Sequence, residues 1–278
     1  RDPEMSRGLG DVYKRQEINN IYKTFNPGTV NEKVALNGVS LKLNDGDFVT
    51  VIGGNGAGKS TLLNAVAGTW KVDEGSILID GIDVTKMQDY KRAKFLGRVF
   101  QDPMMGTVPT MGIDENLALA ARRGKFRGLA REITAKERAG FKEIVKILDL
   151  GLEDRLTSKV GLLSGGQRQA VTLLMASLKK PKLLLLDEHT AALDPKTAAK
   201  VLDATETIVD RDHLTTLMIT HNMKDAIAHG NRLIMMKDGK IILDISGEEK
   251  KNLTVEELLE KFNSVGGEDA VNDRIILG

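Results

Sequence analysis

Segments of strand pattern alternate with segments of helical pattern along most of this chain, and the alternation predicts an α/β fold. A run of four leucines, Leu183–Leu186, is typical of a strand buried on both faces of a sheet. A glycine-rich stretch after the strand predicted at 47–52 leads directly into a helical pattern. Together these observations predict a mainly parallel sheet that is covered by helices on both faces.

Five strands are expected in the first hundred residues. The first two alternate loosely and suit an antiparallel β subdomain. The third is rich in β-branched and aromatic residues and ends in glycines. The predicted strands are residues 17–25, 34–43, 47–52, 74–81 and 96–100. A helix at 61–67 separates the third strand from the fourth.

Helices dominate the prediction for residues 114–178, where charge is interleaved at helical spacing. The elements that follow are a strand at 182–187, a helix at 195–209, a strand at 215–222, a hairpin at 232–245 and a helix at 254–262. Asp238–Gly239 supplies the positive-φ turn of the hairpin. Thr254 is the expected N-cap of the last helix, with Glu257 three residues on.

The composition argues against several classes of protein. A formal net charge of +1 over 278 residues does not suit a protein that coats nucleic acid by electrostatics alone. The chain has no cysteine, which excludes a disulfide framework and a cysteine-ligated metal site. No stretch approaches the roughly 18 apolar residues that cross a bilayer. The length suits one large domain or two small ones.

Residues 1–16 show no periodicity and join abruptly to the first predicted strand. One reverse translation of the segment Asp11–Gln16 is GAT GTG TAT AAG AGA CAG, and this DNA sequence resembles a transposase mosaic-end adapter. We expect residues 1–16 to be adapter-derived and disordered; the alternative is a natural disordered arm, and resequencing the gene decides between them. The folded domain is then expected at 17–263, with a C-terminal tail at 264–278.

The stretch GGNGAGKST predicts a phosphate cradle, because it fits G-x-x-x-x-G-K-[ST] between a predicted strand and a predicted helix. The N–H groups of such a loop point at one anion, and the helix adds its positive N-terminus. Lys59 is expected to reach the β and γ phosphates, and Ser60 to bind Mg²⁺. The alternative is a glycine turn without a ligand. The expected nucleotide-binding residues are Gly53, Asn55, Gly56, Ala57, Gly58, Lys59, Ser60 and Thr61.

A second helix start with similar chemistry lies over a hundred residues further on. The stretch LSGGQ at 163–167 begins an apolar-periodic helix, with Ser164 at the N-cap position. Gly165–Gly166 allow close approach of the backbone to a ligand. The alternative is a well-capped helix with no ligand.

The ordered set of motifs resembles the nucleotide-binding subunit of bacterial ATP-binding cassette (ABC) transporters. The set is GGNGAGKST at 53–61, Gln101 in VFQD, LSGGQ at 163–167, LLLLDE at 183–188, AALD at 191–194 and His221 in ITHN. The resemblance extends from about residue 17 to about residue 245. It implies a P-loop NTPase (RecA-like) core with a parallel sheet, an N-terminal antiparallel β subdomain and a helical subdomain at about 102–178.

The resemblance implies ATP hydrolysis in a head-to-tail dimer of two copies of the chain. In that family ATP lies between the glycine loop of one cassette and the LSGGQ of the other. Ser164, Gly165 and Gly166 would contact the opposite γ-phosphate. Gln167 would help to hold that loop, and Asp194 would cross the dimer seam.

The resemblance also implies roles for residues that follow the predicted strands. Asp187 would orient Mg²⁺ and Glu188 would polarise the attacking water as the general base. Gln101 would touch Mg²⁺ and the water, and His221 would bind the γ-phosphate. The structural alternatives are a solvated strand-end acid for Glu188, an ordinary loop glutamine for Gln101 and a capped core histidine for His221.

Two assignments stay open. The family stacks adenine on an aromatic residue upstream of the glycine loop, and Phe25 is preferred over Tyr22 because it lies 34 residues before Lys59. The alternative for Phe25 is packing at a sheet edge. His189 stands where the family often has proline. It is either a second catalytic base or a structural replacement, and the second is favoured because Glu188 already fills the position of the base.

The expected partners are a second copy of the chain, an integral membrane permease and an extracellular substrate-binding protein, without nucleic acid. The chain would lie peripherally on the cytoplasmic face of the cell membrane. The stretches at 105–120 and 187–202 resemble a bacterial subgroup that is paired with an amino-acid-type binding protein, which implies import of a tryptophan-like amino acid. The alternatives are an exporter ATPase and a non-transport ABC ATPase in a protein complex.

The basic stretch at 122–138 is interpreted as a solvated face of the helical subdomain, because Glu132 and Glu137 offset its charge and few aromatic residues stand beside it. A nucleic-acid patch and a rim that faces anionic lipid are the alternatives.

Overall fold

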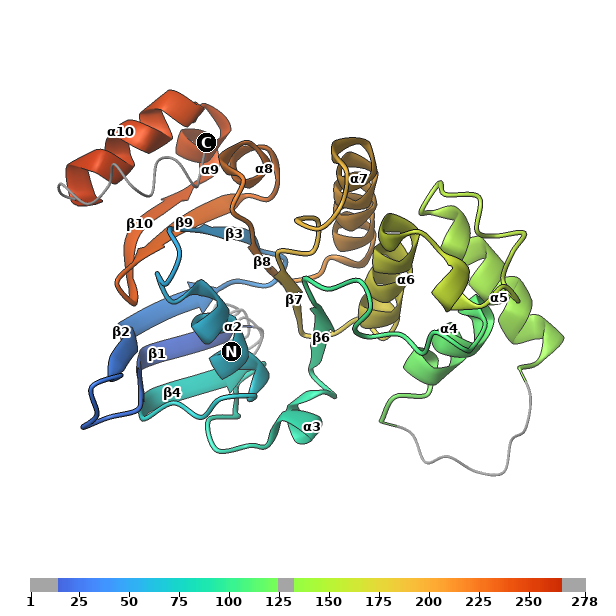
Figure 1. Cartoon of the computed structure of the whole chain (residues 1–278), viewed down its shortest axis with the longest axis horizontal. Helices are drawn as coiled ribbons and strands as arrows, with labels where there is room; N and C mark the ends of the chain where they lie inside the picture. The colour runs from blue at the N-terminus through green and yellow to red at the C-terminus, as the bar shows by residue number, and fades with distance from the viewer. Residues whose placement is uncertain (1–14, 125–132, 267–278) are drawn as a thin grey trace, which may run out of the picture. The chain divides into compact units, whose positions relative to one another are not determined.

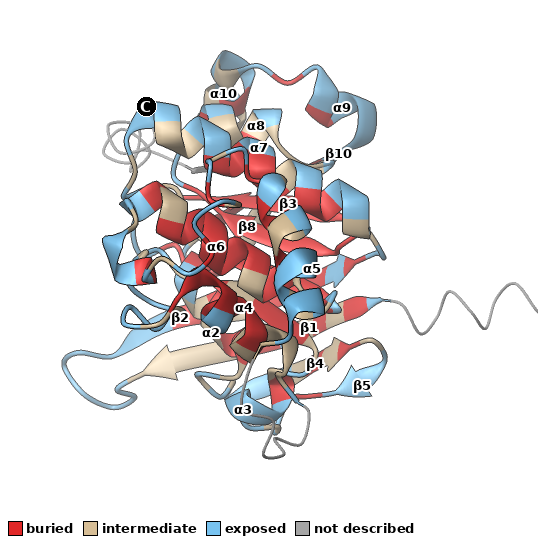
Figure 2. Cartoon of the chain, turned by 90° about the vertical axis from the view of Figure 1, so that its right-hand side faces the viewer, coloured by how far each residue is buried: buried red, intermediate tan, exposed pale blue. Residues whose placement is uncertain are grey.

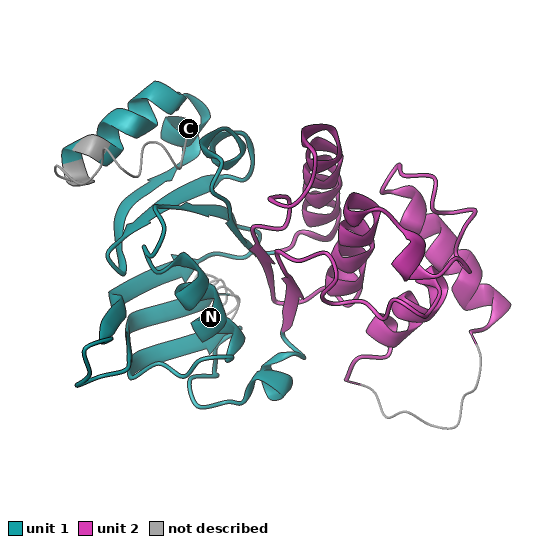
Figure 3. Ribbon diagram, viewed as in Figure 1, with its two compact units in different colours: residues 1–95, 215–278 teal, residues 96–214 magenta. Residues whose placement is uncertain are grey.

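The computed structural model describes residues 15–124 and 133–266 (Figure 1). The chain divides into two compact units, which Figure 3 colours separately. Unit 1 consists of residues 1–95 and 215–278, and unit 2 of residues 96–214. Unit 2 contains the expected helical subdomain at 102–178 together with flanking strands and a further helix.

The first sheet of unit 1 is antiparallel and has the strand order β2-β1-β4-β5. Its strands are β1 (Gln16–Phe25), β2 (Lys33–Leu43), β4 (Glu74–Ile79) and β5 (Ile82–Asp83). Ile18 is opposite Leu41 on one side and Ile77 on the other, and all three are buried. This sheet confirms the predicted antiparallel β subdomain. The sequence did not predict β5.

The second sheet of unit 1 is centred on β3 (Phe48–Ile52), which pairs in parallel with β8 (Thr216–Ile219) and β9 (Arg232–Lys237). Strand β10 (Lys240–Ser246) closes the predicted hairpin, with positive φ at Asp238 and Gly239. Strands β3 and β8 are buried throughout (Figure 2). The helices of the unit are α2 (Lys59–Ala67), α3 (Asp89–Arg92), α8 (Met223–Ala228), α9 (Gly247–Lys251) and α10 (Val255–Gly266).

The last helix, α10, begins where the sequence predicted. Thr254 and Glu257 exchange the hydrogen bonds of a capping box, at 2.9 and 3.2 Å. Leu258 and Phe262 are fully buried in a cluster with residues of α8, β9 and β10. Strand β8 is shorter than the predicted strand at 215–222, since only Thr216–Ile219 pairs with β3.

Unit 2 contains two parallel strands, β6 (Leu96–Val99) and β7 (Leu183–Asp187). They pair from Leu96 opposite Leu183 to Val99 opposite Leu186. Its helices are α4 (Ile113–Ala121), α5 (Ala135–Lys146), the short 3₁₀ helix η1 (Val160–Leu162), α6 (Gly165–Ser177) and α7 (Pro195–Asp212). The expectation of mostly helical structure over 114–178 is confirmed by α4, α5 and α6, which are separated by irregular segments, one of them between Lys146 and Gly165. Asp149 and Gly151 adopt positive φ there, which ends the helix.

The predicted limits of the chain lie partly outside the described residues. The segment at 1–16 that is predicted to be adapter-derived falls there up to residue 14, and so does the predicted tail from residue 267. Gln16 is already the first residue of β1, and its side chain accepts a hydrogen bond from Asp80 N at 2.9 Å. Helix α10 reaches Gly266, beyond the expected end at 263. None of the helices in the described ranges has both the length and the apolar character that a membrane crossing requires.

A buried arginine anchors the C-terminal end of α2. Arg92 is 1% exposed. Burial lowers the pKa of its guanidinium, and the nearby carboxylates of Asp83 and Asp89 oppose that shift. The guanidinium donates to four backbone carbonyls at 2.7 to 3.0 Å, those of Ala65, Val66, Thr85 and Met87. It therefore ties the last turn of α2 to the chain that precedes α3.

Candidate functional site

The glycine loop follows β3 directly and turns into α2. Gly53 has a φ of 148°, and a Cβ there would lie 2.2 Å from the carbonyl oxygen of Met236. Gly58 has a φ of 101° and would place a Cβ 2.5 Å from the carbonyl oxygen of Ala35. No side chain fits at either position without moving the backbone, so the two glycines of the motif are required by the fold of the loop.

The charged residue of the loop is folded over it. Lys59 begins α2 and is 7% exposed, and its Nζ donates to the carbonyls of Gly53 at 2.7 Å and Gly54 at 3.1 Å. Asn55, Gly56 and Ser60 are exposed, whereas Ala57 and Gly58 are buried and Thr61 is half-buried. The ammonium group and the first turn of α2 therefore belong to one cradle with an open face.

The hairpin turn between β9 and β10 buttresses this loop. Gly239 N donates to the carbonyl of Ala57 at 3.1 Å, and Asn37 N donates to the carbonyl of Gly239 at 2.9 Å. The turn thereby joins the glycine loop to β2. The sequence predicted the turn but gave no signal that it contacts the loop, because the two lie far apart along the chain.

His221 lies at the same edge of the sheet as the glycine loop. Val51 of β3 is opposite Ile219 of β8, and Thr220 N donates to the carbonyl of Val51 at 3.1 Å, so the two strands leave the sheet together. His221 is exposed there. Asn222 then caps α8, and burial raises the pKa of Asp225 in that helix, an effect that nearby His229 and His221 partly oppose.

Phe25 and Tyr22, the two candidates for stacking on adenine, make different contacts in the structure. Phe25 is half-buried and meets Trp70 in an edge-to-face contact, with ring centroids 4.9 Å apart and an interplanar angle of 79°. Lys23 Nζ lies 5.6 Å from the centre of the Phe25 ring. By contrast, the Tyr22 hydroxyl would lie 2.9 Å from a Cβ at Gly38, so this ring packs against the neighbouring strand β2.

A carboxylate fixes the strand end that carries Phe25. Asp73 accepts from Lys23 Nζ at 2.7 Å and from Thr24 N at 2.6 Å. Burial alone would raise the pKa of Asp73, but these hydrogen bonds and the charge of Lys23 hold it below its usual value. No pattern in the sequence predicted the contact between Phe25 and Trp70, because it depends on tertiary packing.

In unit 2, the predicted catalytic side chains follow the ends of two paired strands. Val99 of β6 is opposite Leu186 of β7, so Gln101 and the pair Asp187–Glu188 leave the same edge. Gln101 is exposed, and both acids are half-buried. Arg98 Nη2 lies 3.4 Å from an Asp187 carboxylate oxygen, and the Arg98 guanidinium lies 4.5 Å from the centre of the Phe100 ring. Burial lowers the pKa of Arg98, and Asp187 opposes that shift.

Glu188 has a φ of 44°, which is uncommon for a residue with a side chain. Ala191 N donates to its carbonyl at 3.0 Å, and this bond closes a turn after the residue. Such conformations cluster at functional sites, where the surrounding structure holds them. No pattern in the sequence predicted it.

The start of α6 is open to solvent, as an anion-binding helix start requires. Ser164 Oγ accepts from Gln167 N at 3.3 Å and Ser164 N donates to Gln167 Oε1 at 3.2 Å, which confirms the predicted N-cap. Ser164 and Gly165 are exposed. Gly166 is buried, and a Cβ on it would lie 1.8 Å from Thr197 Cγ2 in α7. The second glycine is therefore fixed by helix packing.

Asp194 lies beside this contact as the N-cap of α7. Its carboxylate accepts from Thr197 N at 3.1 Å. Hydrogen bonds from the Thr197 side chain and then from backbone N–H groups hold the pKa of Asp194 below its usual value. Asp194 is exposed, so the charged form can face a second molecule.

The predicted site residues thus form groups within each unit. Unit 1 contains the glycine loop, with His221 at the edge where that loop begins. It also contains Phe25, beside Trp70. Unit 2 brings Gln101 together with Asp187 and Glu188, and it joins the start of α6 to the start of α7.

The predicted metal ligands of each unit carry oxygen donors that suit a hard metal ion. The candidates Ser60, Gln101 and Asp187 offer a hydroxyl, an amide and a carboxylate oxygen, which are the ligands that Mg²⁺ accepts. Within residues 15–124 and 133–266, no three His, Cys, Asp or Glu side chains are grouped as a metal site. Each unit by itself therefore offers oxygen donors of the kind that fit Mg²⁺.

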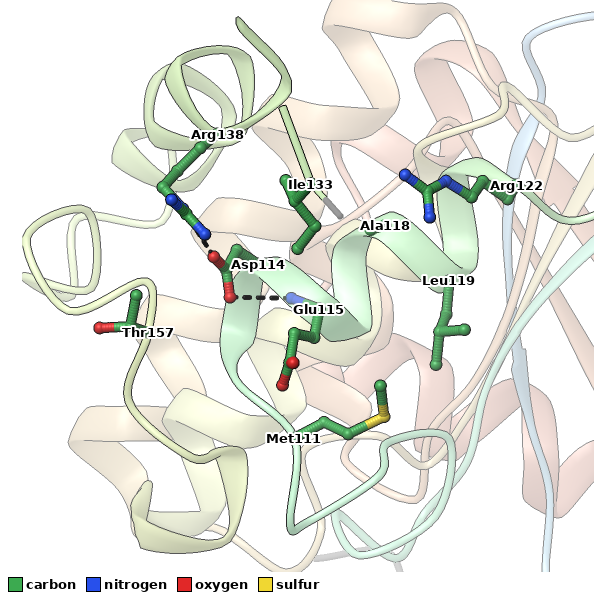
Figure 4. Close-up of a pocket in the computed structure, with 9 residues that line it drawn as sticks. All are labelled: Met111, Asp114, Glu115, Ala118, Leu119, Arg122, Ile133, Arg138 and Thr157. Atoms are coloured by element: carbon green, nitrogen blue, oxygen red, sulfur yellow. Dashed lines mark hydrogen bonds and ion pairs between the residues drawn. The ribbon is translucent and has the colours of Figure 1, made fainter. Parts of the chain in front are cut away.

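A cavity of about 590 Å³ lies on the helices of unit 2, apart from these residues (Figure 4). Its charged side chains are paired: Arg138 Nε lies 2.8 Å from Asp114, and Arg122 lies 3.4 Å from Glu137. Glu115 accepts from Gly112 N at 2.6 Å. These charges are satisfied within the protein, so the cavity shows no feature of a phosphate site.

Comparison with known proteins identifies clear relatives. The profile of a family described as ABC transporter matches residues 36–191. A tyrosine transport ATP-binding protein of Clostridioides difficile (strain R20291) is 46% identical over 251 residues, which cover 88% of this chain and 98% of that protein. The bacitracin export ATP-binding protein BceA of Halalkalibacterium halodurans is 30% identical over 257 residues, covering 90% and 96%.

A solved structure adds a structural relative. It is the dimeric, post-hydrolysis state of an ATP-binding cassette bound to ADP and Pi, with a TM-score of 0.69 and 32% sequence identity. The match covers 83% of this chain and 98% of that chain.

Proposed function

Since this chain belongs to the ABC transporter family, we propose that it powers amino-acid import through a separate permease, as one half of an ATP-bound dimer. The chain is an ATP-binding ATPase with a P-loop NTPase fold. The observation that supports the dimer is the exposed, glycine-rich start of α6, which we propose as a second anion-binding helix start besides that of α2. One chain needs only one such start for its own phosphates, and the other is available to the nucleotide of a second copy.

Each phosphate-binding group has a defined part in this proposal. The N–H groups of the glycine loop and Lys59 bind the β and γ phosphates of the chain's own ATP. Ser164, Gly165 and Gly166 bind the γ-phosphate of the partner's ATP, while Gln167 holds Ser164 in place. Asp194 faces the seam between the two copies.

The chemistry of hydrolysis is assigned to the strand ends. Glu188 accepts the proton of the attacking water, and His221 and Gln101 hold the γ-phosphate and the water. When bound, Mg²⁺ would supply positive charge beside the phosphates. Asp187, Ser60 and Gln101 are its proposed ligands.

The adenine site gives the first testable expectation, because Trp70 is the only tryptophan in the chain. ATP that stacks on Phe25 should change the emission of Trp70, whose ring lies 4.9 Å from that of Phe25. Base stacking contributes about 1–3 kcal/mol. We therefore expect Phe25→Ala to raise the Kd for ATP about tenfold in a fluorescence titration with Mg²⁺ present.

The matched control is Tyr22→Leu, which removes the other aromatic candidate from the same strand. It should leave the Kd for ATP within about twofold. A larger loss of ATP affinity in Tyr22→Leu than in Phe25→Ala would show that the adenine stacks elsewhere.

The membrane partner is proposed to bind unit 2. Met104, Met105 and Val108 expose 61%, 49% and 40% of their surface on the segment that follows Gln101. Apolar side chains gathered on one short segment suit a protein contact. A permease that binds there would sense the state of Gln101, and the chain would then lie peripherally on the cytoplasmic face of the membrane.

The cargo is proposed to be an aromatic amino acid such as tyrosine or tryptophan, delivered by an extracellular binding protein. The name of the relative with 46% identity supports tyrosine as the cargo, and the exporter relative with 30% identity supports export as the second candidate. The test is ATP-driven uptake of labelled tyrosine and tryptophan by the chain and its permease in liposomes. Uptake that depends on a binding protein supports import, and extrusion without one would support export.

A further inference from the structure

The loop that carries Glu188 contains a buried hydrogen-bond pair with no part in the reaction described so far. His189 is 2% exposed and Thr205 is fully buried in α7. Their Nε2 and Oγ1 atoms lie 3.1 Å apart. We propose that His189 and Thr205 are positioning residues that hold Glu188 in its left-handed conformation, an inference that rests on the proposed role of Glu188 as the base.

The direction of the hydrogen bond follows from the second contact of the threonine. Thr205 Oγ1 also lies 2.7 Å from the carbonyl oxygen of Val201, which can only accept. The single hydroxyl proton is therefore used toward Val201. It follows that His189 Nε2 carries a hydrogen and donates it to Thr205.

With this direction of the hydrogen bond, the imidazole of His189 donates to a residue of α7. Nε2 is a protonated donor toward the buried side of α7, so this nitrogen does not act as a base toward water. A second hydrogen bond, from Ala191 N to the carbonyl of Glu188 at 3.0 Å, closes the loop on its other side. The residue next to Glu188 is thus anchored by its side chain, and the carbonyl of Glu188 by the turn.

The anchor explains how an unfavourable backbone conformation persists. A φ of 44° is uncommon for glutamate and is kept only where neighbouring groups hold it. Proline, which often stands at this position in the family, restrains the chain through its ring. Here the restraint is a side-chain hydrogen bond to α7, the helix whose first residues pack on Gly166 at the start of α6.

The test compares Thr205→Val with Thr205→Ser. Valine keeps the shape but removes the acceptor for Nε2–H, while serine keeps the hydroxyl. Because small displacements of a catalytic group cost up to about a hundredfold in rate, we expect Thr205→Val to lower kcat about tenfold. The KM for ATP and the midpoint of the Trp70 titration should stay within about twofold, and Thr205→Ser should keep kcat within about twofold.

Variants of His189 complete a double-mutant cycle with the Thr205 variants. His189→Leu should match Thr205→Val, and His189→Gln, which can place an amide donor near Nε2, should recover most of kcat. The double variant His189→Leu/Thr205→Val should be no slower than His189→Leu alone, since both remove the same bond. Rates are counted per ATP-binding molecule from the Trp70 titration, so partial unfolding does not imitate the effect.

The outcomes separate this inference from the proposed function. Equal kcat values for Thr205→Val and Thr205→Ser would overturn the positioning pair, and so would additive losses in the double variant. A pH–rate profile of His189→Gln that loses its acidic limb would overturn it in favour of a base role for His189. If Glu188→Gln kept parental turnover, the proposed role of Glu188 itself would fail.

Discussion

Replacing Glu188 by glutamine is expected to lower kcat for ATP hydrolysis by roughly 10²–10⁴-fold, the usual contribution of a general base. The amide keeps the size of the side chain and the backbone around the φ of 44°, but it does not take a proton from water. ATP binding does not depend on that step. The Trp70 titration should therefore give a Kd within about twofold of the parent.

A steady-state assay of phosphate release measures this effect. The control is Glu143→Gln, which changes an acid of α5 that is 69% exposed and pairs only with Lys146 among the contacts described. It should hydrolyse ATP at the parental rate. A parental rate in Glu188→Gln would remove Glu188 from the chemistry, and a loss of ATP binding would mean that it serves the nucleotide instead.

Replacing Arg92 by methionine is expected to lower the free energy of unfolding by about 3 kcal/mol or more. The change removes the donors of four backbone carbonyls, and a hydrogen bond from a charged group contributes about 1.5–3 kcal/mol. Relief from burying the charge, which is visible in the lowered pKa of Arg92, offsets part of that loss. Urea unfolding measures the difference.

The same variant should also weaken ATP binding, because Arg92 ties down the helix whose first residue is Lys59. Arg92→Lys keeps the charge but not the planar fork, so an intermediate loss of stability is expected. Lys251→Met is the control. Lys251 is 71% exposed and pairs with Glu248, so its loss should cost about 0.5 kcal/mol or less. Equal stability of Arg92→Met and Lys251→Met would contradict the anchoring role.

The phosphate-binding segments could be predicted because each is contiguous. The glycine loop, the start of α6 and the acids after β7 combine local turn chemistry with a strand or a helix, and short-range sequence rules cover both. The hairpin turn at Asp238–Gly239 was predicted for the same reason. Short-range rules could not predict that this turn contacts Ala57, because the contact depends on the order of strands in the sheet.

The contacts that were missed join residues far apart along the chain. Trp70 meets Phe25 and Thr205 meets His189 only after helices and strands have packed, and neither residue type signals its partner. After Lys146 the helix ends although charged and apolar residues keep a helical spacing there, because Asp149 and Gly151 turn the chain out of the helix. Local backbone conformation outweighed the periodic pattern.

In the proposed dimer, the start of α6 in one copy completes the ATP site of the other copy. Glu188→Gln with ATP and Mg²⁺ should elute from a sizing column as a dimer, and as a monomer without ATP. Adding Ser164→Arg, which places a bulky cation at the exposed start of α6, should return the ATP-bound protein to a monomer. An ATP-bound Glu188→Gln that stays monomeric, or a dimer that is indifferent to Ser164→Arg, would contradict the shared site.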